Sequence, residues 1–411
     1  MNNLVLVRRD VFVDDDLERL RDILDFPAQH QPRWNDHPEL ADTCRRLREL
    51  PPLVSEAEVT ELRDRLAAVA AGEAVVLQAG DCAESFEECS QEHVVAKLAN
   101  LDRLSAKFAF NNGKSVVMIG RLGGQFGKPR SSPTELHGDV EIPAFLGHIV
   151  NSEASNAVAR EPDPARMLKA RELSKNVLTA VLRQREKGSP PVAGSNRFGP
   201  WASHEALLLH YELPQLRRSQ MGEGMILGST HLPWVGERTR QIDGAHVAML
   251  SSIRNPVGCK LGPNVTAEEA VELCSVLDPS REAGRLVLIC RMGTGRIEAS
   301  LPAVVEAVGS AGHQAVWLCD PMHGNTVTVN GGTKTRRLAD IICECRKFCE
   351  IMNRLGVPAG GLHLETSHME VTECLGGTVR DSRLLSLRYT TLCDPRLSPS
   401  QALEVINAAT G

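Results

Sequence analysis

The sequence predicts an α/β fold, a (β/α)8 TIM barrel preceded by a helical extension. From residue 74 onward, short apolar runs alternate with stretches that have helical spacing. Near-continuous apolar runs are typical of parallel strands covered by helices on both faces. Eight such runs favour a closed barrel. The chain has 411 residues, which is enough for one barrel and an extension.

The expected strands are the apolar runs at 74–80, 115–121, 143–150, 224–232, 256–262, 285–293, 315–320 and 361–365. The third run, PAFLGHIV, is also compatible with a loop. Before residue 71, Leu-rich and charge-rich segments have helical spacing and are separated by proline-bearing turns. We therefore expect a helical extension at 1–70 and a catalytic barrel at 71–411. The extension should pack on the barrel or on a neighbouring subunit, because its apolar stripes need to be covered.

Composition excludes several classes of protein. Lys and Arg number 46 against 52 Asp and Glu, so a net charge of −6 argues against a nucleic-acid-binding surface. No window approaches the roughly 18–20 apolar residues of a membrane span. The N-terminal apolar stretch is short and is followed by acidic residues, unlike a secretion signal. The 12 cysteines lack the spacing of a small disulfide scaffold, which predicts reduced thiols and a cytoplasmic location.

Polar residues follow the expected strands at their C-terminal ends, where barrels of this kind carry their chemistry. A single polar residue there is ordinarily satisfied by local contacts. Six cations on one face of an acidic protein instead predict anionic substrates, because guanidinium and ammonium groups bind phosphate and carboxylate. These six are Arg121, Lys128, Arg130, Arg238, Lys260 and Arg291.

The same face should hold a thiol, an imidazole and two carboxylates, from Cys82, His323, Glu365 and Asp394. This mixed donor set suits a divalent transition metal with an open position for substrate. A Lewis acid beside anion-binding cations indicates carbonyl activation on a phosphorylated substrate. The residues alone therefore predict metal-dependent carbon–carbon or carbon–oxygen chemistry on sugar phosphates or related acids.

Several long segments resemble the type II 3-deoxy-D-arabino-heptulosonate 7-phosphate (DAHP) synthases. They occur in order from about residue 50 to the last turns and are rich in rare residues. The segments are QAGDCAESF, GRLGGQFGKPRSS, SHEALLLHYE, HLPWVGERTRQIDGAHV, NPVGCKLGP, GRLVLICRMG, WLCDPMHGNT, GLHLETS, VTECLGG and YTTLCDPRLSPSQAL. The resemblance implies a (β/α)8 barrel that condenses phosphoenolpyruvate with erythrose 4-phosphate and releases phosphate. That reaction is the first step of the shikimate pathway to the aromatic amino acids.

The resemblance also implies roles for individual residues. Four residues match the metal ligands of the family, which bind a divalent ion such as Mn²⁺ or Co²⁺: Cys82, His323, Glu365 and Asp394. Matching its phosphoenolpyruvate site are Arg121, Glu237, Arg238, Lys260 and Arg291. Matching the segment that meets the sugar phosphate are Lys128, Pro129, Arg130 and Ser131, with Lys128 reaching both substrates. The expected proton-handling residues are Lys128, Glu237 and His323. Cys82 and Cys393 resemble a family pair that can oxidise to a disulfide; the alternative is a ligand with a thiol nearby.

The chain departs from the family pattern near the expected second-substrate site. The family usually has YRGDxVN where this chain has FLGHIVN, so Leu146 and His148 replace an Arg and an Asp. The change is either a compensated loop substitution or a sign of a different aldehyde substrate. The chain also lacks room for the insertions of longer members. In this it resembles the short members of phenazine and other secondary-metabolite pathways, which predicts weak or absent inhibition by aromatic amino acids.

The leading hypothesis is a DAHP synthase that serves the shikimate pathway or a secondary-metabolite pathway. One alternative keeps the chemistry but uses another phosphorylated aldehyde or an amino-sugar phosphate. A second alternative is a non-catalytic homologue that binds chorismate mutase, and the intact metal and anion positions argue against it. The family resemblance further implies a homodimer or homotetramer.

Overall fold

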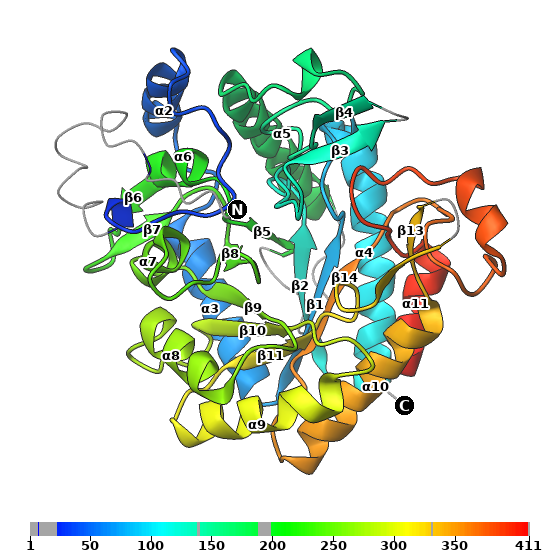
Figure 1. Ribbon diagram of the computed structural model, residues 1–411. Helices are drawn as coiled ribbons and strands as arrows, with labels where there is room; N and C mark the ends of the chain where they lie inside the picture. The colour runs from blue at the N-terminus through cyan, green and yellow to red at the C-terminus, as the bar shows by residue number, and fades with distance from the viewer. Residues whose placement is uncertain (1–6, 8–22, 138–139, 188–198, 330–331, 410–411) are drawn as a thin grey trace.

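The computed structural model describes residues 7, 23–137, 140–187, 199–329 and 332–409. Eight parallel strands close a barrel in which neighbours in sequence are neighbours in space (Figure 1). Their bounds are Ala74–Gly80 (β1), Ser115–Arg121 (β2), Trp201–Glu205 (β5), Leu232–Val235 (β8), Val257–Leu261 (β9), Leu286–Cys290 (β10), Val316–Cys319 (β11) and Gly361–Glu365 (β14). The predicted (β/α)8 barrel is confirmed.

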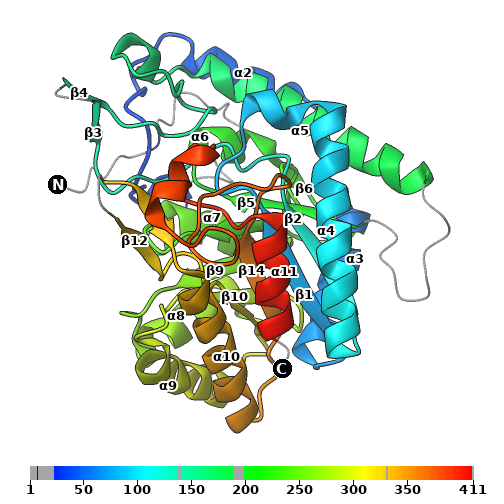
Figure 2. The ribbon, with the colours of Figure 1, turned by 90° about the vertical axis from the view of Figure 1, so that its right-hand side faces the viewer.

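Helices follow the strands and cover the outside of the barrel. They are Gln91–Asn112 (α4), Ala165–Lys187 (α5), Leu209–Glu212 (α6), Ala245–Ser251 (α7), Ala267–Leu277 (α8), Ile297–Ser310 (α9), Leu338–Arg354 (α10) and Pro399–Ala408 (α11). Local sequence sets their ends. For example, Ser90 caps the first turn of α4 and Gly113, with φ of 63°, ends it. Helix α4 packs between α5 and α11 (Figure 2).

Three short hairpins extend from the barrel loops. They pair Thr134–His137 (β3) with Val140–Pro143 (β4), Leu216–Arg218 (β6) with Met225–Leu227 (β7), and Thr326–Thr328 (β12) with Lys334–Arg336 (β13). The third hairpin follows β11, at the end of the barrel where the polar residues gather. It therefore lies close to the candidate site.

The prediction of the third strand was wrong. Pro143 ends β4 and residues 144–150 form a loop and turn, so the third barrel strand is β5. Gly147 has φ of 101°, and a Cβ there would lie 2.0 Å from the Phe126 carbonyl oxygen, so the chain bends sharply instead of extending. The run is apolar because its loop is buried. Strand β5 escaped notice because its sequence, WASHE, mixes apolar and polar residues. The prediction of the fourth strand was also wrong in position, since 224–232 holds β7 and the turn after it and overlaps β8 only at Leu232.

Two of the helices expected before the barrel are present, at Leu40–Glu49 (α2) and Glu56–Ala70 (α3). Most of a third expected helix, in the first 24 residues, lies outside the described residues. Helix α3 contacts β1 and β11, and its Leu62, Leu66 and Val69 belong to the same apolar cluster as the barrel interior. Because α3 directly precedes β1, it covers the end of the barrel where the strands begin. The division between extension and barrel at residue 70 stays a prediction.

Strand register brings the first site residues together. In the pairing of β1 with its two neighbours, Gly80 lies opposite Arg121 on β2 and opposite Glu365 on β14. A Cβ at Gly80 would lie 2.6 Å from the Arg121 carbonyl oxygen, so glycine permits this close approach. Arg121 and Glu365 therefore meet across the C-terminal end of β1.

Candidate active site

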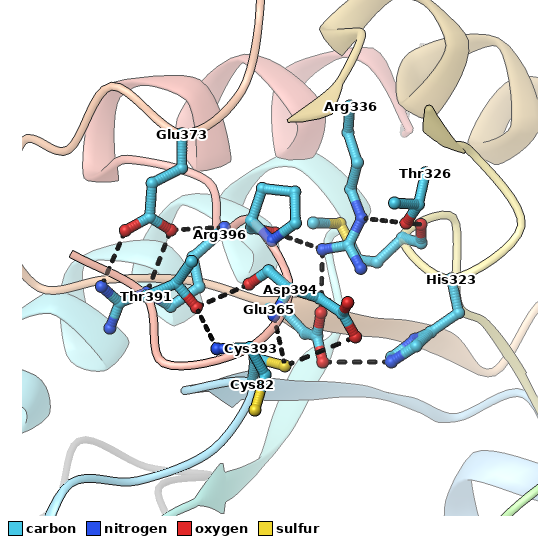
Figure 3. Close-up of polar contacts among 12 residues, drawn as sticks. Cys82, His323, Thr326, Arg336, Glu365, Glu373, Thr391, Cys393, Asp394 and Arg396 are labelled. Carbon is cyan, nitrogen blue, oxygen red and sulfur yellow. Dashed lines mark hydrogen bonds and ion pairs between the residues drawn. The ribbon is translucent and has the colours of Figure 1, made fainter. Parts of the chain in front are cut away.

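Four residues predicted as metal ligands meet at the C-terminal end of the barrel (Figure 3). Ligand atoms of Cys82, Glu365 and Asp394 all lie within 4.8 Å of one another. The Nε2 atom of His323 lies 3.1 Å from Oε1 of Glu365. We call these four residues the ligand cluster. It combines one sulfur, one nitrogen and two carboxylate groups, a donor set that fits a divalent transition metal.

The ligand cluster is assembled from four separate segments. Cys82 comes two residues after β1 and Glu365 is the last residue of β14, whereas His323 follows β11 and Asp394 lies in the loop before α11. His323 is oriented by Asp320, whose Oδ2 lies 2.7 Å from its Nδ1. A carboxylate on one ring nitrogen turns the other nitrogen toward the cluster, as in many metal-binding histidines.

Two of the predicted cations contact the ligand cluster directly. The Nζ atom of Lys128 lies 3.0 Å from Cys82 Sγ and 3.0 Å from Asp394 Oδ2. Arg121 donates through Nη2 to Glu365 Oε1 at 3.1 Å. Both side chains are buried, at 8% and 2% exposure, so these ion pairs are shielded from water. Their charges balance the carboxylates and leave Lys128 in contact with two ligands at once.

Burial and charge together shift the pKa values of the cluster. Burial, a hydrogen bond with Cys393 and the nearby Glu365 raise the pKa of the Cys82 thiol well above its usual value. Burial opposes ionisation of Glu365, but His323, Lys128 and Arg336 outweigh it and hold the pKa of that carboxyl well below its usual range. Burial likewise opposes the charge on Lys128, yet Asp394 and Cys82 raise the Lys128 pKa well above its usual value. The carboxylates are thus ionised and Lys128 is charged. Cys82 and Cys393 are both free thiols.

The predicted cations of β9 and β10 lie beside His323. Lys260 Nζ is 3.0 Å from Asp320 Oδ2 and 3.4 Å from His323 Nδ1. Arg291 donates through Nη2 to the His323 carbonyl oxygen at 3.0 Å. Burial lowers the pKa of Lys260, against the raising effect of Asp320. Together with Arg121, these residues form an arc of positive charge next to the ligand cluster.

The loops that carry Arg291 and His323 are joined by a buried carboxylate. Glu344 of α10 accepts hydrogen bonds from the Gly293 amide at 2.8 Å and from Asn325 Nδ2 at 2.5 Å. Its side chain is 0% exposed. Glu344 therefore fixes the two loops relative to each other.

The remaining predicted substrate residues lie outside this inner group. Arg238 is exposed and donates to Ser131 Oγ at 2.9 Å, and Arg130 pairs with Glu135 at 3.0 Å. Pro129, between Lys128 and Arg130, is buried.

Glu237 pairs with Arg240 through two bonds of 3.0 Å and accepts from the Gly262 amide at 2.6 Å. The structure therefore separates an inner cluster from an outer set of residues. In the described part of the chain, Glu237 makes no hydrogen bond or ion pair with the ligand cluster.

Sequence reasoning missed two buried residues of the inner site. Arg336, on β13, pairs with Glu365 Oε2 at 2.8 Å, and it was missed because it comes from a hairpin and not from a strand end. His363, inside β14, lies between Gln78 and Arg121. Its Nδ1 is 2.7 Å from Gln78 Oε1, and its Nε2 is 2.8 Å from Arg121 Nη1. A guanidinium can only donate and the side-chain oxygen of Gln78 can only accept. His363 therefore accepts from Arg121 through Nε2 and donates to Gln78 through Nδ1. The two-residue alternation of β14 could have indicated that His363 and Glu365 face the same side.

The loop between β2 and Lys128 is held by Glu84. This carboxylate, 1% exposed, accepts from the backbone amides of Gly123 at 2.9 Å, Gly124 at 2.8 Å and Gln125 at 2.9 Å. The loop before α11 is held in a similar way by Arg396, which pairs with Asp81 at 2.7 Å. Arg396 also pairs with Glu373 at 2.9 Å (Figure 3). Buried ion pairs thus position both segments that contribute to the site.

The departure at FLGHIVN is absorbed within its own loop. His148 is 3% exposed, and its ring accepts from the Phe86 amide at 2.9 Å and pairs with Glu153 at 2.5 Å. Both ring nitrogens are therefore occupied. Leu146 uses its backbone, since its carbonyl oxygen accepts from the Lys128 amide at 2.9 Å. These contacts favour the interpretation of a compensated loop substitution.

Fold and site together define a class of protein: a (β/α)8 barrel with a thiol–imidazole–carboxylate cluster and buried cations at the C-terminal ends of its strands. Anionic substrates and a metal ion are compatible with that arrangement. Among the described residues, no helix is both long enough and apolar enough to cross a membrane.

Comparison with known proteins identifies the family. The model of the class-II DAHP synthetase family matches residues 18–193 and 193–409. A probable phospho-2-dehydro-3-deoxyheptonate aldolase of Pseudomonas fluorescens is 43% identical over 389 residues, covering 95% of this chain and 96% of its own. The phospho-2-dehydro-3-deoxyheptonate aldolase of Streptomyces coelicolor is 39% identical, covering 93% and 94%. The chain belongs to the class-II DAHP synthase family, which confirms the resemblance and the prediction of an enzyme.

A solved structure supports the architecture. The phospho-2-dehydro-3-deoxyheptonate aldolase of Francisella tularensis superposes with a TM-score of 0.53 at 14% identity, covering 90% of this chain and 97% of its own. At that identity the likeness concerns the fold alone.

Proposed function

We propose that this enzyme condenses phosphoenolpyruvate with erythrose 4-phosphate, in a metal-dependent reaction that yields DAHP and phosphate. Family membership supports the reaction. The observation that carries metal dependence is the convergence of ligand atoms from Cys82, Glu365 and Asp394 within 4.8 Å, with His323 beside them. A structural role alone does not require four donors of three chemical kinds in one place.

The residues present fit a divalent metal ion, with Mn²⁺ and Co²⁺ as the proposed ions. The ion would be held by Cys82, His323, Glu365 and Asp394. When bound, it supplies a Lewis acid that polarises the aldehyde oxygen. Cys82 gives up its thiol proton as the ion binds, so affinity should rise with pH.

The chain's cations bind and orient the two substrates. Arg121, Lys260 and Arg291 surround the position proposed for the phosphate and carboxylate of phosphoenolpyruvate. Glu237 and Arg238 are proposed for the same substrate, whereas Lys128, Pro129, Arg130 and Ser131 are proposed to meet the phosphate of the sugar. Arg238 donates to Ser131 Oγ, which brings the two sets together. Holding both substrates in contact favours attack of C3 of phosphoenolpyruvate on the aldehyde carbon. Water then adds at C2, and the C2–O bond breaks as phosphate leaves.

Proton transfer is proposed for Lys128, His323 and Glu237, of which the first two lie at the ligand cluster. Lys128 carries a proton at Nζ between Cys82 and Asp394, and it can donate to the oxygen that the aldehyde carbonyl becomes. His323, oriented by Asp320, and Glu237 are the further candidates. His323 would handle its proton at Nδ1, because its Nε2 faces the proposed ion, and Glu237 would handle one at a carboxylate oxygen.

Steady-state loss of phosphoenolpyruvate absorbance in the presence of erythrose 4-phosphate tests the proposal. Turnover should cease with EDTA and return with Mn²⁺ or Co²⁺. Cys82→Ala should abolish this metal-dependent turnover, whereas Cys343→Ala, on the outer helix α10, should retain it. Turnover unaffected by EDTA would refute metal dependence. If phosphoenolpyruvate binds but is consumed only with another phosphorylated aldehyde, the substrate assignment is wrong. No consumption with any aldehyde would favour a non-catalytic homologue.

We also propose a cytoplasmic homodimer or homotetramer, weak inhibition by aromatic amino acids, and a role in a secondary-metabolite pathway. The support is membership of the family. Sedimentation as a monomer at micromolar concentration would refute the oligomer. Tight, rate-suppressing binding of an aromatic amino acid would refute the absence of inhibition.

A further inference from the structure

Arg336 has an unusual place in the site. It lies on β13, outside the barrel strands, yet its side chain is 0% exposed. Its Nη1 pairs with Glu365 Oε2 at 2.8 Å and also donates to the carbonyl oxygen of Pro395 (Figure 3). Its Nε donates to Thr326 Oγ1 at 3.0 Å. Arg336 therefore connects the hairpin β12–β13, strand β14 and the loop that carries Asp394.

The two carboxylate oxygens of Glu365 face different partners. Oε1 faces the interior of the cluster, with His323 at 3.1 Å, Arg121 at 3.1 Å and Lys128 at 3.6 Å. Oε2 faces Arg336. This ion pair, which does not have the geometry of a hydrogen bond, draws Oε2 toward the guanidinium. It leaves Oε1 as the oxygen directed at His323 and the other ligands.

The second contact acts on a different ligand. Pro395 directly follows Asp394, so the bond from Arg336 to its carbonyl oxygen fixes the backbone next to Asp394. A single guanidinium nitrogen therefore touches the segments that carry two of the four ligands. The contact from Nε to Thr326 orients the guanidinium plane itself. Because this third contact comes from a second nitrogen, it depends on the planar fork of arginine, which an ammonium group lacks.

We propose that Arg336 is a positioning residue for the metal site. It draws Oε2 of Glu365 to its guanidinium, so that Oε1 would be the oxygen available to the ion, and it ties the segment of Asp394 to Glu365. This inference rests on the proposed metal-dependent function. Charge balance is the simpler alternative, and a lysine at this position would satisfy it. Geometry and charge therefore make different predictions for Arg336→Lys.

Titration of the metal-free full-length protein with Co²⁺, followed by calorimetry and by the thiolate-to-cobalt absorption, separates the two. Arg336→Lys should weaken Co²⁺ binding by about 10- to 100-fold, as is typical when a residue that orients a metal ligand is lost. It should also change the absorption band, since Glu365 would coordinate differently. The matched control is Arg337→Lys, at a neighbouring side chain that is 55% exposed. This variant should bind as the wild type does.

A second variant keeps the proposal testable if Arg336→Lys fails to fold. Thr326→Val retains the arginine and removes the acceptor of its Nε, together with the 3.5 Å hydrogen bond that Thr326 Oγ1 donates to the Met322 carbonyl oxygen. It should weaken Co²⁺ binding by about threefold, the effect of one hydrogen bond. Wild-type affinity and an unchanged spectrum in Arg336→Lys or, failing that variant, in Thr326→Val would overturn the inference. A wild-type protein that shows no thiolate-to-cobalt band would instead refute the proposed metal site itself.

Discussion

The carboxylate of Glu344 should make the stability of this protein depend on pH near neutrality. It lies between the loops after β10 and β11, where it accepts hydrogen bonds from Gly293 and Asn325. Burial, with a contribution from the charge of Asp320, raises the pKa of Glu344 from 4.5 to about 7. Replacing Glu344 with Gln removes the ionisable group and keeps its size.

The sign and size of the effect follow from this shift. A pKa raised on folding means that the folded protein binds the proton more tightly than the unfolded chain does. The resulting stabilisation is fully present below pH 4.5 and is lost as the pH rises through 7. The shift corresponds to on the order of 3 kcal/mol of unfolding free energy. The amide of Gln cannot accept from Asn325, which adds a cost of about 1 kcal/mol at every pH.

Urea denaturation of the metal-free wild type and of Glu344→Gln, over a pH series from 4.5 to 8.5, measures the difference. We expect the wild type to be the more stable at acidic pH and the variant to be the more stable at pH 8. Taking the difference removes the contributions of groups common to both proteins. The matched control is Glu350→Gln, at an exposed carboxylate on the same helix, which should follow the wild type. A difference between wild type and Glu344→Gln that stays constant with pH would refute the reasoning.

Three further substitutions test other parts of the structure. Glu84→Ala leaves three buried amides without an acceptor and should cost about 3 kcal/mol or more in unfolding free energy. The control Glu87→Ala, at an exposed site, should cost little. A loss of unfolding free energy below about 1 kcal/mol in Glu84→Ala would contradict this prediction. His363→Leu removes the acceptor of Arg121 and should raise the KM for phosphoenolpyruvate about tenfold without changing Co²⁺ affinity, so an unchanged KM would argue against it. Leu62→Ala, at the base of the barrel, should lower the free energy of unfolding by about 2–5 kcal/mol, measured by denaturation. The control is Leu50→Ala, at an exposed side chain, and equal losses in the two variants would contradict the packing of Leu62.

The sequence predicts most of the barrel because most strands are continuous apolar runs, which burial on both faces requires. It fails at β5, where Ser203 and His204 interrupt the apolar pattern, and at 143–150, where a buried loop is as apolar as a strand. Apolar composition indicates that a segment is buried, but it does not say whether the segment is a strand or a loop. Only backbone geometry, such as the positive φ of Gly147, distinguishes a buried loop from a buried strand.

The ligand cluster could be predicted because its residues follow strands or belong to long segments resembling one family. Residues that contact this cluster were harder to find. Arg336 comes from a hairpin whose place over the barrel depends on tertiary packing, and His363 is one interior residue among several. Single-sequence patterns carry no signal for contacts that depend on how loops fold back over the strands.

The position of α3 has a consequence for the order in which the chain can complete its fold during synthesis. This helix leaves the ribosome early, but its apolar side chains join a cluster that also contains Val316 and Leu318 of β11. At typical elongation rates, β11 follows α3 by on the order of tens of seconds. Before β11 is synthesised, the apolar face of α3 can pack against only some of the side chains that surround it in the finished barrel. The base of the barrel is therefore among the last regions of the core to close, although its first helix is among the first to be made.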